Sequence, residues 1–227
     1  FIRDSVHTIT AHAEIFYEIV CVKDENGKIT SLDFHYIFPP SMKKIFGRYV
    51  QIIPYKVAKE SHVKAGIRFI PKNRILHIKP PKELGGKREL KLIIQRLAKL
   101  SGTVTPSFHI PSMERNEVTG FDFSLYIDRK YMEKAILTKK YGWNQRDYQD
   151  KHILEYYSMH RYLVMANATA MLRQQILQDL NKALNNSYVN AGVEIVLEDL
   201  PTVETVAKEF EKLKKGGLKF SDLITKN

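Results

Sequence analysis

The pattern of apolar and polar positions predicts a strand-rich first part of the chain. Residues 13–22 (AEIFYEIVCV) are rich in β-branched and aromatic side chains, which favour a strand. Asn26-Gly27 fits a type I′ hairpin turn, because both residue types tolerate positive φ. Apolar residues partly alternate again over 29–38, and Pro39-Pro40 should end this second strand.

Three more short strands are expected, at about 49–57, 67–70 and 74–78. Together with the hairpin they predict one mostly antiparallel sheet over 13–79. Residues 1–12 have helical apolar spacing and resemble the end of a helix. Because the chain begins with Phe1 and not with Met, we expect an excised fragment or residues missing before it.

The stretch 69–100 predicts a strand, a tight loop and an amphipathic helix in succession. Gly85-Gly86 marks the turn after the proline-flanked strand. Helical spacing then predicts a helix over 87–100, with apolar positions at Leu90, Ile93, Ile94, Leu97 and Leu100.

The pattern after residue 100 is less regular at first. Residues 103–110 could be extended, and clean alternation of apolar side chains over 120–127 predicts a strand. Asp128 is a suitable N-cap for a short helix that would run through Leu137.

A long helix is expected over 148–184, where apolar residues keep helical spacing without Gly or Pro. A short strand at 194–197 and a helix starting at Pro201 and stopping at Gly216-Gly217 should follow. The predicted fold class is therefore α+β, a mostly antiparallel sheet with packed helices and one long helix in the C-terminal half.

The charge balance of the chain suggests a negatively charged partner. The 227 residues include 36 Lys+Arg against 25 Asp+Glu, a formal net charge of +11. Such an excess favours a polyanion, most simply nucleic acid. Because the cations are dispersed, a solvated basic surface is an equally good interpretation.

The sequence offers little for catalysis, cofactors or metals. The lone Cys21 excludes an internal disulfide and a cysteine zinc site. No His has a ligand partner at a convincing spacing, and His77, within an apolar run, is expected to be a satisfied core residue. Gly85-Gly86-Lys87 could bind an anion, although a plain turn is favoured. We expect no enzyme activity, no cofactor, no metal site, no membrane-spanning stretch and a reducing, soluble environment.

Two groups of cations are the candidate nucleic-acid contacts. One group surrounds the Gly85-Gly86 turn, which we call the central loop. The other lies in a polar connector with Tyr141, Trp143 and Tyr148, whose aromatic rings could stack on bases. For each group alone, a solvated face is the competing interpretation. The candidates near DNA are Lys72, Arg74, Lys79, Lys82, Lys87, Arg88, Lys139, Lys140 and Arg146.

Three passages, taken in order, resemble the portal proteins of tailed bacteriophages. Residues 11–42 (AHAEIFYEIVCVKDENGKITSLDFHYIFPPSM) are similar to the wing hairpin of that family. Residues 69–90 (FIPKNRILHIKPPKELGGKREL) resemble its strand, glycine loop and helix, with the matching core at 75–78. Residues 202–224 (TVETVAKEFEKLKKGGLKFSDLI) resemble its tail of helix, glycine and short capped helix.

The resemblance implies a structural role. It implies a ring-shaped dodecamer at one capsid vertex, with double-stranded DNA passing through its centre during genome packaging and ejection. It also implies terminase and head-tail connector proteins as partners, and a virion location after assembly in the host cytoplasm. Residues 1–100 would be a portal-like wing and core, and 101–227 a mainly helical part.

Two alternatives remain open. One is a monomeric basic nucleic-acid-binding module that grips single strands near Trp143. The other is an enzyme that acts on a phosphorylated ligand at the Gly85-Gly86-Lys87 turn.

Overall fold

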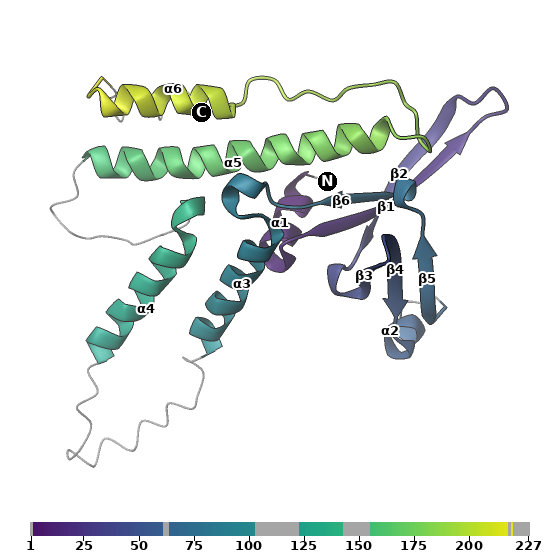
Figure 1. Ribbon diagram of the computed structural model, residues 1–227, viewed down its shortest axis with the longest axis horizontal. Coiled ribbons are helices and arrows are strands. Elements are labelled where there is room, and N and C mark those ends of the chain that lie inside the picture. The colour runs from purple at the N-terminus through teal and green to yellow at the C-terminus, as the bar shows by residue number, and fades with distance from the viewer. Residues whose placement is uncertain (1, 61–63, 103–122, 143–154, 218, 220–227) are drawn as a thin grey trace, which may run out of the picture. The chain divides into compact units, whose positions relative to one another are not determined.

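The computed structural model describes residues 2–60, 64–102, 123–142, 155–217 and 219, and these form an α+β fold (Figure 1). The chain divides into two compact units, one of residues 1–87 and 173–199 and the other of 88–172 and 200–227. This division differs from the predicted regions 1–100 and 101–227. Helix α3 (Gly86–Gly102) and helix α5 (Glu155–Leu184) each contribute residues to both units.

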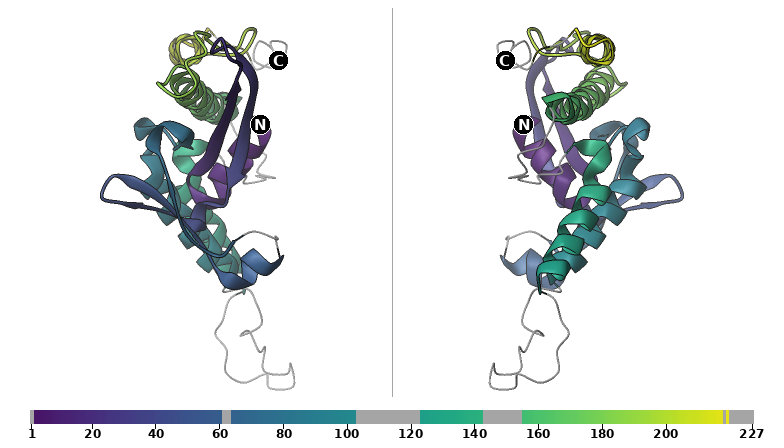
Figure 2. Two further views of the ribbon diagram at one scale, coloured as in Figure 1. Left: turned by 90° about the vertical axis from the view of Figure 1, so that its right-hand side faces the viewer. Right: turned by 90° about the vertical axis from the view of Figure 1, so that its left-hand side faces the viewer.

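The first unit begins with α1 (Ile2–His12) and the expected hairpin of β1 (Ile15–Lys23) and β2 (Ile29–Ile37), a long ribbon in Figures 1 and 2. The predicted type I′ turn is wrong, since only Gly27 has positive φ there. Instead, the Asp24 carboxylate accepts hydrogen bonds from the backbone N–H groups of Asn26 and Lys28. This side-chain acceptor stabilises a longer loop.

The strands form two three-stranded antiparallel sheets, so the prediction of one sheet is wrong. The first has the order β2-β1-β6, with β6 at Ile75–Ile78. The second has the order β3-β4-β5, formed by Met42–Ile45, Arg48–Ile53 and Gly66–Ile70.

The sequence pattern missed β3 and extended β4 too far. Phe46 and Gly47 both have positive φ and join β3 to β4, so the type I′ geometry occurs where no Asn-Gly pair signals it. Beyond Ile53, Pro54 interrupts the strand and the short helix α2 (Tyr55–Glu60) follows, because proline is favoured at a helix start.

One apolar cluster joins the two sheets of this unit, and each of the six strands contributes one buried side chain to it. The Phe16 and Tyr49 rings, from different sheets, lie edge to face with centroids 6.1 Å apart. The members are Phe16, Ile37, Met42, Tyr49, Ile70 and Ile75. The opposite face of β1 is also buried at Ile15, Tyr17 and Ile19, and the Tyr17 hydroxyl lies 3.0 Å from the Ser5 hydroxyl of α1.

The second unit contains most of α3, together with α4 (Phe123–Thr138), most of α5, and α6 (Val203–Lys214). The strand predicted over 120–127 is wrong where the chain is described, from Phe123 onward, and Asp128 lies inside α4 instead of capping a helix. Four alternating apolar positions are too few to outweigh a segment that continues into good helix formers, since helix growth is cooperative. Residues 103–110 lie outside the described chain.

Helices α5 and α6 lie side by side through a buried apolar seam (Figures 1 and 2). The seam is formed by Met159 and Leu163 of α5 and by Val206 and Leu213 of α6. Thr202 caps α6 through a capping box with Thr205, and Gly216, with φ +70°, ends it as predicted. The long helix is confirmed over 155–184, whereas residues 148–154 lie outside the described chain.

The strand predicted at 194–197 is wrong, because the described chain offers it no backbone ladder. Side chains from the end of α5 satisfy part of its backbone instead. Asn181 both accepts from the Ile195 N–H and donates to the Ile195 carbonyl, at 2.8 Å each. Among the described helices, none is long and apolar enough to cross a membrane.

Candidate nucleic-acid interface

The central loop is built by proline and glycine between β6 and α3. Pro80 and Pro81 are buried after β6. Gly85 and Gly86 both have positive φ, and their N–H groups donate to the carbonyls of Lys82 (2.8 Å) and Pro81 (3.0 Å). Two amides that an anion would need are therefore already engaged, which supports a structural turn.

Lys87, a candidate DNA contact, is held by a carboxylate of the same unit. Its ammonium lies 2.6 Å from Glu14 Oε1, and the Glu14 side chain is only 11% exposed. Burial alone would raise the pKa of Glu14, but the hydrogen bonds from His77 and Lys87 outweigh it and leave the pKa below its ordinary value. Glu14 is therefore ionised at neutral pH.

His77 connects this carboxylate to the second sheet. Its Nε2 lies 2.9 Å from Glu14 Oε2 and its Nδ1 lies 3.1 Å from the Tyr49 hydroxyl. Burial lowers the pKa of His77, and the bond to Glu14 only partly opposes this. We therefore assign a neutral imidazole that donates from Nε2 and accepts from Tyr49. His77 is a satisfied residue, as predicted.

Glu18 and Arg74 are also engaged within the first unit. Arg68 of β5 donates to Glu18 Oε1 at 2.6 Å. Arg74, another candidate, donates to the Tyr188 hydroxyl at 3.0 Å, and its guanidinium lies 4.8 Å from the centre of that ring. Its Nε is buried without a hydrogen-bond partner in the described chain. Arg74 thus has a structural role.

Exposed cations remain on each unit considered alone. Lys72, Lys79 and Lys82 are exposed on the first unit. Arg88, Lys139 and Lys140 are exposed on the second, and the Lys140 ammonium lies 2.6 and 2.9 Å from the two carboxylate oxygens of Glu89. Within the described residues, ion pairs engage Lys87 and Lys140 but not Lys72, Lys79, Lys82, Arg88 or Lys139.

The predicted aromatic connector is only partly described. Tyr141 ends the short 3-10 helix Lys139–Tyr141 and is fully buried. Burial, together with the nearby charge of Glu89, raises its pKa to about 12. A buried ring is not available to stack on a base. Arg146, Trp143 and Tyr148 lie outside the described chain.

A cavity of about 520 Å³ opens beside the His77 network, entirely within the first unit. Tyr49 and His77 line it, together with Lys72 and Lys182 and the carboxylate of Asp179. Burial raises the pKa of Asp179, and a hydrogen bond from Gln175 partly opposes the effect. The cavity has charges of both signs and does not select one ligand class.

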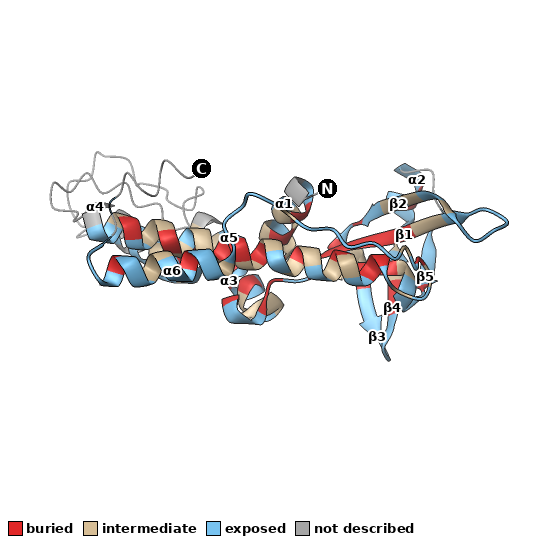
Figure 3. Cartoon of the chain, turned by 90° about the horizontal axis from the view of Figure 1, so that it is seen from above, coloured by how far each residue is buried: buried red, intermediate tan, exposed pale blue. Residues whose placement is uncertain are grey.

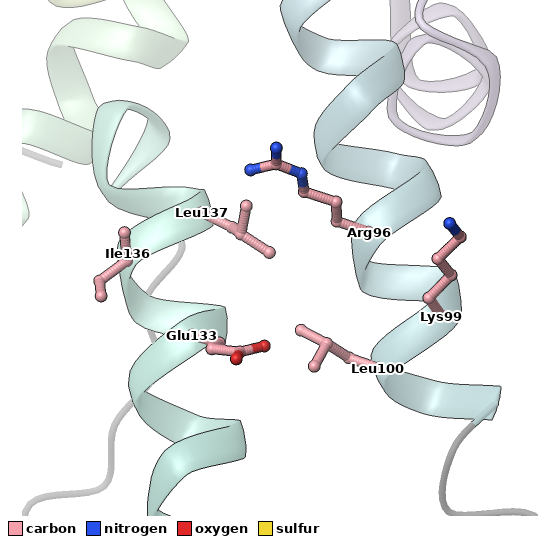
Figure 4. Close-up of a pocket in the computed structure, with 6 residues that line it drawn as sticks. All are labelled: Arg96, Lys99, Leu100, Glu133, Ile136 and Leu137. Atoms are coloured by element: carbon pink, nitrogen blue, oxygen red, sulfur yellow. The ribbon is translucent and has the colours of Figure 1, made fainter.

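A second space, of about 430 Å³, lies between α3 and α4 in the second unit. Figure 4 shows Arg96 and Leu137 pointing toward one another across it, as do Leu100 and Glu133.

In the part of the chain that the structure describes, no three His, Cys, Asp or Glu side chains gather to hold a metal ion.

Sequence reasoning missed the partners of the engaged cations. Glu14 and Glu18 are four residues apart on one face, beside and within an otherwise apolar strand, and carboxylates placed this way need a counter-charge. That signal was present in the sequence. The identity of the partners, Lys87 and Arg68, depends on strand pairing and loop geometry and had no local signal.

Comparison of the chain with protein-family models, curated proteins and solved structures found no match.

Proposed function

We propose that the chain is a portal-like structural subunit that assembles into a ring at a capsid vertex and conducts double-stranded DNA. In this role it reads no sequence and performs no catalysis of its own. The observation that carries the proposal is the order of the three portal-like passages along the chain. They correspond to the β1–β2 hairpin, to β6 with the glycine turn and α3, and to α6 with its glycine stop.

Exposed apolar side chains support an assembly role. Ile67 and Phe69 of β5 are 67% and 66% exposed, and Ile45 and Ile52 are exposed on the neighbouring strands. Ile52, Ile67 and Phe69 are neighbours on one face, and contiguous apolar surface of this kind is uncommon on monomers and marks interaction sites. A closed ring would cover it with neighbouring subunits.

The charge distribution supports passage of DNA. A net charge of +11, together with exposed lysines that no ion pair engages within the described residues, can hold phosphates weakly and without sequence preference. Such contacts do not require base stacking, so the burial of Tyr141 does not weaken the proposal. Terminase and head-tail connector proteins would be the partners at the two ends of the ring, in the virion and during assembly in the host cytoplasm.

Electron microscopy and DNA binding test the proposal together. Negative-stain images of the longest soluble form should show rings with a central hole. Affinity for double-stranded DNA of two unrelated sequences should be equal and should fall steeply with salt. A chain that remains monomeric and prefers single strands would contradict the proposal and favour the basic nucleic-acid-binding module.

A further inference from the structure

An extended segment after α5 has one hydrogen-bonding edge that no described residue occupies. Residues 193–198 (VEIVLE) are rich in β-branched side chains but belong to no sheet. Asn181 bonds to both backbone groups of Ile195, and Asn185 donates to the Val193 carbonyl at 2.8 Å. The side chains of the two asparagines thus replace a neighbouring strand as hydrogen-bond partners for the backbone of residues 193 and 195.

The other edge is free among the described residues. Successive residues of an extended chain direct their N–H and C=O groups to opposite sides. Glu194, Val196 and Glu198 therefore face away from the asparagines, and none of them has a hydrogen-bond partner. Val196 is also 66% exposed, so both its backbone and its side chain are available to another chain.

The β3-β4-β5 sheet offers a matching edge in the same unit. β5 lies at the end of the strand order, and among the described strands it pairs with β4 alone. Ile67 is directly opposite Ile52, so their exposed side chains form one apolar face, and Figure 3 shows β5 largely exposed. The other edge, β3, carries Lys43 and Lys44, and lysines protect an edge from strand pairing.

The two segments of chain that would pair carry opposite net charge. Residues 42–70 contain seven Lys or Arg (Lys43, Lys44, Arg48, Lys56, Lys59, Lys64 and Arg68) and one acidic residue, Glu60. Residues 183–199, which belong to the same unit as β5, contain three acidic residues (Glu194, Glu198 and Asp199) and no Lys or Arg. Opposite charge steers two surfaces together and fixes their register.

We propose that residues 193–198 of one copy of the chain add as a fourth strand to the β5 edge of a second copy. The occupant of the β5 edge, beside the exposed Ile67 side chain, is thus another subunit, and the contact joins two different surfaces. Such a head-to-tail contact repeats around a ring or along a filament. The inference rests on the proposed ring assembly and names the surfaces that would form it.

Two aspartate substitutions test the contact separately. Ile67→Asp damages the sheet surface and Val196→Asp damages the strand segment. Both side chains are about two-thirds exposed, at 67% and 66%, so neither change should unfold the chain, and thermal melts will check this. Ile136→Asp, at a position 68% exposed on α4, is the matched control.

The expected result is loss of assembly in each variant alone and partial recovery on mixing. Each variant should run at the single-chain mass of 26.4 kDa, while Ile136→Asp assembles like the parent. An equimolar mixture of Ile67→Asp and Val196→Asp should form a dimer of twice that mass, because one intact surface remains on each partner. If Val196→Asp is unstable, Glu194→Lys with Glu198→Lys replaces it and tests the same segment by charge.

The outcomes separate this inference from the proposed function. Rings that persist in both variants would overturn the strand addition and leave the ring proposal standing. Open filaments that both variants abolish would support the strand addition and contradict the portal-like role. A parent chain that remains monomeric at high concentration would overturn both.

Discussion

His77 Nε2 lies 2.9 Å from Glu14 Oε2, although 63 residues separate the two along the chain. The bond joins β6 to the residue that precedes β1. Through Nδ1, the same imidazole contacts the Tyr49 hydroxyl of the second sheet. One largely buried side chain, 11% exposed, therefore links both sheets of the first unit, and the ammonium of Lys87 completes the network from the start of α3.

Replacing Glu14 should weaken this unit. Glu14→Ala leaves His77 without its acceptor and Lys87 without its counter-charge, so we expect a loss of about 1–3 kcal/mol in the free energy of unfolding. Because Lys87 is partly exposed, water compensates part of its loss. Urea unfolding measures the effect. Glu25→Ala, in the exposed hairpin turn, is the control and should change stability by less than about 0.5 kcal/mol. Equal effects would contradict the network.

Stability should fall on mild acidification because of His77. Its pKa is lowered below 6.5 in the folded chain, so the folded state binds fewer protons than the unfolded state. The stabilisation is therefore complete above pH 6.5 and is lost as the pH falls through the folded pKa. Glu14, whose ordinary pKa is 4.5 and whose folded pKa is lower, acts in a separate and more acidic window.

A comparison of variants isolates this effect. In His77→Gln, the slope of unfolding free energy against pH below 6.5 should be smaller by up to about 1.4 kcal/mol per pH unit. The exposed Asn26→Ala variant, which removes no titratable group, should keep the parent slope. An unchanged slope in His77→Gln would show that the imidazole is not buried in its neutral form.

The sequence predicted the individual helices and strands better than their arrangement in space. The β1–β2 hairpin, α3, most of α5 and α6 follow from patterns within a few turns of chain. The split into two sheets does not, because it depends on the cluster that Phe16 and Tyr49 join across distant strands. The extended segment 193–198 has strand composition, yet side chains of Asn181 and Asn185 occupy the position of a neighbouring strand.

The candidate nucleic-acid interface was also predictable only in part. Cations could be located by inspection, but whether each is free depends on its tertiary neighbours. Lys87 and Arg74 are engaged by Glu14 and Tyr188, which lie 73 and 114 residues away in the sequence, whereas Lys82 is exposed. No periodicity distinguishes these cases.

Gly142 should not tolerate a side chain. It has φ +65°, and a Cβ there would lie 2.6 Å from the backbone N of Met165 in α5. Gly142→Ala should therefore cost about 1–3 kcal/mol more than a substitution that only strains φ. Gly192→Ala is the matched control, because Gly192 has the same φ of +65° and nothing within 4 Å of its Cβ position. Similar thermal shifts for both variants would argue against close packing of Gly142 on α5.

Free and engaged cations should differ in their effect on DNA binding. Lys82→Ala and Arg88→Ala, measured separately, should each lower the slope of log affinity against log salt by up to about 0.9 for double-stranded DNA. Neither should change the unfolding free energy by more than about 0.5 kcal/mol. Lys87→Ala should lower the unfolding free energy and leave the salt slope unchanged, since the Lys87 ammonium is paired with Glu14. A fluorescence anisotropy titration at several salt concentrations distinguishes these cases. Unchanged slopes in both exposed variants would remove them from the interface.

Mass by light scattering, on the longest soluble form and with and without double-stranded DNA, tests the central claim most directly. The account predicts a large closed oligomer of the 26.4 kDa chain whose mass stays constant over a tenfold dilution, and DNA should add to that mass at low salt. A particle with the mass of one chain at every concentration, with or without DNA, would contradict the assembly of this chain into a ring.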